Sequence, residues 1–227
     1  GNSDLPQFNF VALDTVSQNV TITNNLSLST FELPALKIVG ANFLLQNNEG
    51  LTNFNLPQLE IIEGYLHILD QTNLGQFKFP ELTRIGSRSF ESPPGLNYYP
   101  RHSLLIQGNG GLTVLNGFPK LESVGNNFSV DSNPDLVEVN SFNILKNVGR
   151  DFVFNRNSSL TTITGFSVLQ SSQYLRFLEN KVLNSMSTFD SYKKATKNIV
   201  ITGNSDLPQF NFVALDTVSQ NVTITNN

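Results

Sequence analysis

The sequence predicts an all-β protein, a right-handed parallel β-solenoid with coils of 22–25 residues. Three observations predict this fold. Pairs of apolar residues spaced i, i+2 recur at intervals of 23 or 24 residues in all cases but one, and a side-chain amide stands three residues after each pair. The third observation is that residues 1–25 recur without a single change as residues 203–227.

Each apolar pair marks a short strand, because alternation of inward and outward side chains has a period of two and the pairs are rich in β-branched and aromatic residues. We expect the strands to begin at Val20, Phe43, Leu66, Leu104, Phe128, Phe152, Leu175 and Ile199, and Val222 begins the next copy. The intervals between Val20 and Val222 amount to 202 residues. The long repeat therefore contains a whole number of coils and can continue in register.

The amides after the strands predict a ladder inside the solenoid. Where the chain turns out of a strand, backbone N–H and C=O groups lose their partners, and a stacked amide supplies both a donor and an acceptor. We expect these side chains to be buried and bonded to the backbone. The predicted ladder consists of Asn25, Asn48, Gln71, Asn109, Asn133, Asn157, Asn180 and Asn204.

The remaining inward residues of a coil follow at spacings of two and three, as in Leu51, Phe54, Leu56, Leu59 and Ile62. These spacings fit neither one helix nor one strand and indicate short segments that bend around a common core. We expect residues 1–227 to form one continuous solenoid, with a tandem period at 1–202, the start of the next at 203–227, and uncapped ends.

The coil motif resembles a known family. It stands as LKIVGANFLLQNNEGL at 36–51, as LEIIEGYLHI around residues 60–68, and as LESVGNNFSVDSNPDL at 121–136. These segments resemble the receptor L-domain group of leucine-rich-repeat folds, and most of all the fungal glycolipid-anchored cell-wall repeat proteins. The resemblance implies a leucine-rich-repeat solenoid and, for function, a receptor ectodomain, a wall protein or an adhesin.

One irregularity interrupts the period. Residues 87–103, SRSFESPPGLNYYPRHS, form an insertion whose prolines exclude a regular coil. Aromatic residues and Arg are favoured at interfaces. Two interpretations of the insertion remain open: it forms a contact loop, or it is a loop without function. The contact residues would be Phe90, Tyr98, Tyr99, Arg101 and His102.

Composition argues against several functional classes. The charged fraction is 14% and the net charge is −4, so no basic surface for nucleic acid is expected. The chain has no cysteine, and no apolar run reaches the roughly 20 residues of a membrane span. His67 and Asp70 form a strand-borne pair without a nucleophile. We therefore expect no enzymatic activity, no cofactor and no metal site.

Five Asn-x-Ser/Thr sequons are present, at Asn19, Asn25, Asn127, Asn157 and Asn221. Asn25 and Asn157 belong to the predicted ladder and should be inaccessible. Asn19, Asn127 and Asn221 each precede a strand at an outer corner, where we expect N-glycans on a secreted protein.

Together these observations predict a structural role. We expect a segment of a giant extracellular tandem-repeat filament, coat or surface appendage. Its partners would be the preceding and following repeats of the same polypeptide and laterally associated copies. The alternative is a receptor or adhesin ectodomain that binds a ligand through the 87–103 loop or the outward strand face.

Overall fold

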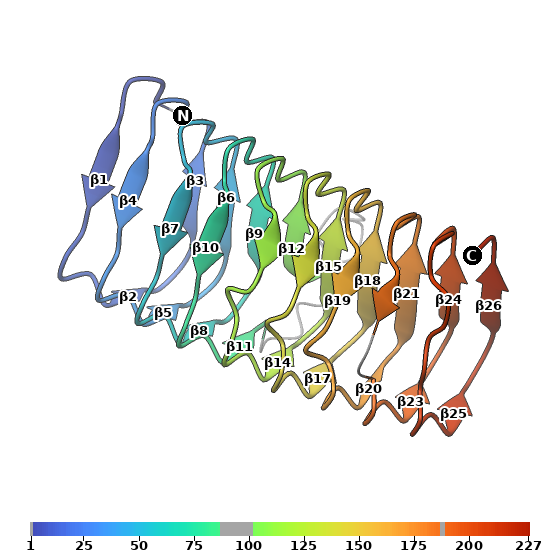
Figure 1. Ribbon diagram of the computed structural model, residues 1–227. Helices are drawn as coiled ribbons and strands as arrows, with labels where there is room; N and C mark the ends of the chain where they lie inside the picture. The colour runs from blue at the N-terminus through green and yellow to red at the C-terminus, as the bar shows by residue number, and fades with distance from the viewer. Residues whose placement is uncertain (1, 87–101, 187–188) are drawn as a thin grey trace, which may run out of the picture.

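The computed structural model describes residues 2–86, 102–186 and 189–227. The described chain is all-β, without a helix, and its parallel strands stack into a solenoid of about nine turns. The two termini lie at opposite ends of the stack (Figure 1). The predicted fold class, a parallel β-solenoid, is therefore confirmed.

The largest strands form a nine-stranded parallel sheet along one face of the solenoid. They follow one another in chain order, one strand to a coil (Figure 1). These strands are β3 (Val20–Thr23), β6 (Phe43–Gln46), β9 (Leu66–Leu69), β12 (His102–Gln107), β15 (Asn127–Asp131), β18 (Asp151–Asn155), β21 (Tyr174–Leu178), β24 (Ile199–Thr202) and β26 (Val222–Thr225).

The register of this sheet matches the register that the sequence predicts. Val20 pairs with Phe43, and Phe43 pairs with Leu66. Across the long interval Leu66 pairs with Leu104. The insertion therefore leaves the stack in register, as expected where a surface loop adds little closure entropy.

A second nine-stranded sheet consists of two-residue strands, one from each coil. Its members are β2 (Thr15–Val16), β5 (Ile38–Val39), β8 (Ile61–Ile62), β11 (Arg84–Ile85), β14 (Ser123–Val124), β17 (Asn147–Val148), β20 (Ser171–Ser172), β23 (Lys194–Ala195) and β25 (Thr217–Val218).

The third face is divided into three smaller sheets rather than one. The first pairs β1 (Gln7–Asn9) with β4 (Thr30–Glu32), and the second pairs β7 (Asn53–Asn55) with β10 (Gln76–Lys78). The last contains β13 (Val114–Leu115), β16 (Glu138–Val139), β19 (Thr162–Ile163) and β22 (Ser185–Met186).

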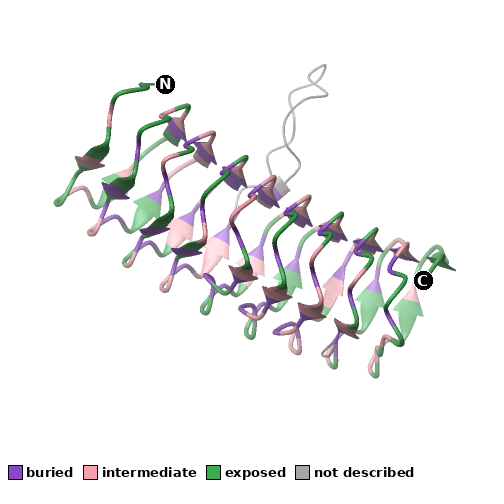
Figure 2. Cartoon of the chain, turned by 45° about the horizontal axis from the view of Figure 1, so that its top comes forward, coloured by how far each residue is buried: buried purple, intermediate pink, exposed green. Residues whose placement is uncertain are grey.

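The core is a continuous apolar column enclosed by the three faces, and Figure 2 shows buried residues, in purple, on successive coils along the solenoid. Phenylalanine rings of successive coils contact one another in two series along this column. Phe8, Phe31, Phe54 and Phe77 form the first, with ring centroids 5.3–5.5 Å apart. The second begins at Phe79 and continues through Phe118, Phe142, Phe166, Phe189 and Phe212, at 5.1–5.9 Å.

The last described coil has one open side. Ile199 and Ile201 are 3% and 0% exposed, whereas Val222 and Ile224, at the same inward positions one coil later, are 55% and 48% exposed. Phe10, in the first coil, is 55% exposed. Inward side chains of a solenoid are covered by the next coil. At these positions the described residues provide no further coil to cover the inward side chains.

The boundary of the predicted insertion needs correction. His102 and Ser103 belong to strand β12, in which His102 pairs with Asn127. Ser103 is 3% exposed, and its Oγ accepts a hydrogen bond from the N–H of Asn126 at 3.0 Å. The sheet therefore begins two residues before Leu104, since a parallel partner is available to pair with them.

Candidate functional site

The amide ladder runs inside the solenoid, directly after the first sheet. Asn25, in the first coil, is half-buried. The rest of the predicted set is fully buried: Asn48, Gln71, Asn109, Asn133, Asn157, Asn180 and Asn204. Asn2 and Asn227 hold equivalent positions, because the N–H of Asn2 donates to Asn25 Oδ1 and the N–H of Asn204 donates to Asn227 Oδ1. The ladder thus extends one residue beyond the predicted set at each end.

Each asparagine of the ladder bonds to the backbone of the coil before it. Asn180 Oδ1 accepts the N–H of Asn157 at 3.1 Å, and its Nδ2 donates to the carbonyl oxygen of Phe154 at 3.1 Å. Asn48 and Asn204 donate in the same way to the carbonyl oxygens of Ile22 and Phe177, both at 2.9 Å. The ladder therefore satisfies buried polar groups that would cost free energy if left unpaired.

Gln71 connects the ladder across the long interval between strands β9 and β12, and its side-chain hydrogen bonds differ from those of the asparagines. Its Oε1 accepts the N–H of Asn48 at 3.2 Å, and its own N–H donates to Asn109 Oδ1 at 3.3 Å. Its Nε2 donates to Leu69 within the same coil at 2.9 Å. The longer side chain thus bonds to its own strand end.

The residue before each amide has a left-handed backbone, a feature that our sequence interpretation missed. Its φ is 53–56° at the non-glycine positions, which are Asn24, Asn47, Asp70, Ser132, Arg156, Glu179 and Asn226. Gly108 and Gly203 occupy the same position with φ of 68° and 73°. Asn, Asp and Gly adopt this conformation most easily. The enrichment of these residue types directly before the ladder amides was the sequence signal that could have predicted the left-handed backbone.

A second row of amides lies at the opposite end of the strands, before the first sheet. Asn19 Oδ1 accepts hydrogen bonds from the N–H and the Nδ2 of Asn42, at 3.1 and 2.9 Å. Asn42 Oδ1 accepts the N–H of Tyr65 at 3.0 Å, and Asn198 Oδ1 accepts the N–H of Asn221 at 3.0 Å. In this row each amide bonds to the coil after it, so the two rows hold adjacent coils together in opposite directions.

The asparagines of the sequons differ in exposure. Asn19 and Asn221 are exposed, whereas Asn157 is fully buried. The expectation that Asn127 lies at an exposed corner is wrong, because Asn127 is 6% exposed. Strand β15 begins at Asn127 itself, and Asn127 Oδ1 accepts the N–H of Asp151 at 3.3 Å.

Most of the predicted contact loop lies outside the described residues. This applies to Phe90, Tyr98, Tyr99 and Arg101. His102 belongs by its backbone to strand β12. The proposed role of this loop as a contact surface therefore stays a prediction.

The outward face of the first sheet is only partly open to solvent. His67 is 4% exposed and its ring stacks on Tyr65 with a centroid distance of 4.0 Å, and Ser129 is 3% exposed. Asp70 Oδ2 accepts a hydrogen bond from the Nε2 of Gln46 at 3.2 Å. Asp70 lies at the left-handed corner before Gln71, with a φ of 53°.

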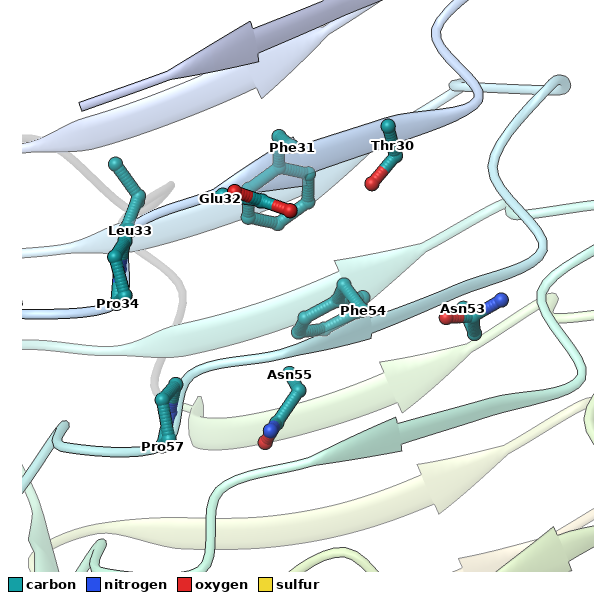
Figure 3. A pocket seen from close by; sticks show the side chains of 9 residues that line it. All are labelled: Thr30, Phe31, Glu32, Leu33, Pro34, Asn53, Phe54, Asn55 and Pro57. Carbon is teal, nitrogen blue, oxygen red and sulfur yellow. The ribbon is translucent and has the colours of Figure 1, made fainter. Parts of the chain in front are cut away.

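A groove of about 350 Å³ lies on the third face, between β4 and β7. It marks a break between two small sheets, since β4 pairs with β1 and β7 pairs with β10. Figure 3 shows its lining, which contains one ionisable side chain, Glu32. The residues around it are Thr30, Phe31, Glu32, Leu33, Pro34, Asn53, Phe54, Asn55 and Pro57.

Within the described part of the chain, no cluster of three or more His, Cys, Asp or Glu side chains is arranged to hold a metal ion. The same residues contain no helix that is long and apolar enough to span a membrane. No model of a known protein family matches the chain, and no curated protein matches it. The candidate functional feature that the structure describes is the stack of coils with its amide ladder.

Proposed function

We propose that this chain is a structural segment of an extracellular tandem-repeat filament, coat or surface appendage. Its partners are the preceding and following repeats of the same polypeptide, and neighbouring filaments associate laterally. Exposed Asn19 and Asn221 carry N-glycans in this proposal. The role of such a segment is to extend a rigid rod, since each coil is stabilised by the coils on either side.

One observation carries the proposal: identical sequences occupy equivalent places eight coils apart. The N–H of Leu13 donates to Phe10 at 3.2 Å, and the N–H of Leu215 donates to Phe212 at 3.2 Å. Asn24 and Asn226 both have a φ of 56°. A further 202-residue period can therefore follow the first without a change of register.

We also propose that the coil is of the leucine-rich-repeat, receptor L-domain-like type, close to fungal cell-wall repeat proteins. Two features support this assignment. Leucine dominates many inward positions, with Leu51, Leu56 and Leu59 fully buried in one coil. The Asn ladder follows the main strand at the position that the leucine-rich motif assigns to Asn.

The filament proposal is tested on native material. Parallel coils stack at about 4.8 Å, so eight coils give an axial repeat of roughly 38 Å. We expect fibre diffraction or cryo-microscopy to show this repeat, and mass measurement to give a polypeptide of many 202-residue periods. A capped polypeptide of a single period would contradict the proposal.

The alternative is a receptor or adhesin ectodomain, favoured by the insertion that interrupts the period. Deletion of residues 87–101 separates the two functions. A filament retains its axial repeat without the insertion, whereas an adhesin loses ligand binding while its circular dichroism remains unchanged.

A further inference from the structure

We propose that Asn116 is a site of spontaneous deamidation and that the amide ladder protects Asn109 from the same reaction. These are the two asparagines of the sequence that a glycine follows, Gly117 and Gly110. The proposal goes beyond the proposed function, because the reaction alters the chain covalently and needs no partner. It rests on the different surroundings of two identical dipeptides in one coil.

The reaction joins the backbone nitrogen of the glycine to the Cγ atom of the preceding asparagine. The new bond closes a cyclic imide, and the side-chain nitrogen takes up the displaced proton and leaves as ammonia. Water then adds to one of the two ring carbonyls and opens the imide to aspartate or isoaspartate. A following glycine promotes the reaction, because it has no Cβ atom to shield the attacking nitrogen. Asparagine is among the residues that limit chemical durability.

Both reacting groups are available at Asn116. This residue is exposed and lies in an irregular segment directly after strand β13. Its side chain makes no hydrogen bond to any residue that the structure describes, and the N–H of Gly117 donates to none of them either. The side-chain amide can therefore rotate toward the attacking nitrogen, and water can reach the imide.

The main chain around Gly117 is bonded to the coils on both sides. The carbonyl oxygen of Gly117 accepts the N–H of Phe79 at 2.8 Å, and the N–H of Phe118 donates to Ser141 Oγ at 2.6 Å. A Cβ atom at position 117 would lie 2.5 Å from a backbone oxygen of the adjacent coil. Close packing thus requires the glycine that makes Asn116 reactive. Isoaspartate lengthens the main chain and would displace these bonds, so aspartate is the favoured product in the folded chain.

The surroundings of Asn109 oppose the same reaction. Asn109 is fully buried, and its Oδ1 accepts the N–H of Gln71 at 3.3 Å. Its Nδ2 donates to the carbonyl oxygen of Ile68 and to Asn133 Oδ1, both at 3.0 Å. Attack by the nitrogen of Gly110 requires the amide to leave these partners and water to enter the core. Asn109 therefore reacts only when the coil opens locally.

Deamidation of Asn116 places a new carboxylate on the third face. Leu115, the residue before it, pairs with Val139, so position 116 lies beside Asn140 in the next coil. The Nδ2 of Asn140 donates to Glu138 Oε1 at 2.9 Å. The new charge therefore arises close to an existing carboxylate, and the third face becomes more acidic as the protein ages.

The first test compares the two sites within one peptide. Trypsin cleavage after Arg101 and Lys120 releases both asparagines together, and fragmentation in the mass spectrometer separates them. After incubation of the folded chain at pH 8, we expect deamidation at Asn116 to be at least tenfold faster than at Asn109. In concentrated urea the two rates should become similar, because the ladder is lost. Equal rates in the folded chain, no reaction at Asn116 in the folded chain, or a tenfold difference that persists in urea would overturn the proposal.

The second test removes the protection locally. Asn133→Leu deletes one acceptor of the Asn109 side chain, and we expect it to raise the rate at Asn109 at least threefold while the rate at Asn116 is unchanged. Phe166→Ala is the matched control, since it destabilises the core without removing a ladder residue. Circular dichroism verifies that both variants are folded. An unchanged rate at Asn109 in Asn133→Leu, or an equal rise in Phe166→Ala, would overturn the protective role of the ladder.

Discussion

The Oδ1 atom of Asn133 accepts two hydrogen bonds from Asn109 in the preceding coil, one from its N–H at 3.1 Å and one from its Nδ2 at 3.0 Å. Asn133 also donates from Nδ2 to the carbonyl oxygen of Ile106 at 3.0 Å. One side chain therefore satisfies polar groups from two other residues in a region from which solvent is excluded.

Replacing Asn133 with Leu should destabilise the protein by about 1–3 kcal/mol, because the N–H of Asn109 and the carbonyl oxygen of Ile106 lose buried partners. Urea denaturation followed by circular dichroism measures this change. Asn53→Ala is the matched control, since Asn53 is exposed and bonds through its side chain to Thr52. An equal effect of both substitutions would contradict the role of the ladder.

A glycine in the corner before the first sheet should be intolerant of a side chain. A Cβ atom at Gly125 would overlap the carbonyl oxygen of Gly86 in the adjacent coil. We expect Gly125→Ala to lower the midpoint of urea denaturation strongly or to prevent folding, because backbone from one coil or the other must move. The control is Gly75→Ala, where the nearest atom to an added Cβ is 3.8 Å away. This second change should be neutral or slightly stabilising.

The period of the apolar pairs predicts the first sheet well, because each strand repeats the same inward positions and any slip would expose them. The two-residue strands of the second sheet give a weaker signal. At β20 the strand is Ser171–Ser172, and Ser172 is buried through its bond to Tyr192 at 2.6 Å rather than by apolar character. Two residues are too few to show the alternation of inward and outward side chains that identifies a strand. The sequence of one coil therefore does not predict these strands, which form by pairing with the adjacent coils.

The candidate site was likewise predictable from the sequence only in part. The amide positions follow from their fixed distance to the strands, since every coil must satisfy the same backbone groups. The accessibility of Asn127 could not be predicted, because Asn19 and Asn127 both stand directly before an apolar pair. In the structure Asn127 belongs to strand β15 and has His102 as a register partner in β12, whereas Asn19 precedes strand β3. Strand length is set by neighbouring coils and is not visible in one coil's sequence.

Fully buried phenylalanines should contribute more to stability than exposed ones. Phe166 is fully buried, with ring contacts to Phe142 at 5.1 Å and to Phe152 at 4.9 Å. We expect Phe166→Ala to cost about 3–5 kcal/mol. Phe10 is 55% exposed, so Phe10→Ala should cost about 1 kcal/mol or less. Equal losses in denaturation experiments would argue against a continuous core.

Glycan attachment should follow the exposure of the sequons. In a eukaryotic secretory host we expect modification at Asn19 and Asn221, whose side chains are exposed, and none at Asn127 or Asn157. The hydrogen bonds that Asn19 accepts use Oδ1, so a sugar on Nδ2 leaves them intact. Mass spectrometry of proteolytic peptides measures occupancy, and Asn19→Gln is the control. A glycan at Asn127 would contradict the described burial.

Tyr192 should make stability depend on pH in the alkaline range. Its hydroxyl bonds to Ser172 Oγ at 2.6 Å, and burial raises the pKa of Tyr192 from 10.0 to about 12. The folded protein therefore keeps this proton between pH 10 and 12, whereas the unfolded chain loses it. The stability is fully present below pH 10 and falls as the pH rises through the folded pKa. Over two pKa units the loss is about 3 kcal/mol.

The substitution Tyr192→Phe isolates this effect, since the other titrating groups are unchanged. At pH 8 we expect the variant to be less stable than the unmodified protein by about 1 kcal/mol, because Ser172 loses a hydrogen-bond partner. Between pH 10 and 12 the unmodified protein should lose stability faster than the variant, so the difference should shrink and then reverse. Urea denaturation at pH 8 and pH 11.5 measures both values. Parallel stability curves for the two proteins over this range would show that Tyr192 ionises as readily in the folded chain as in the unfolded one.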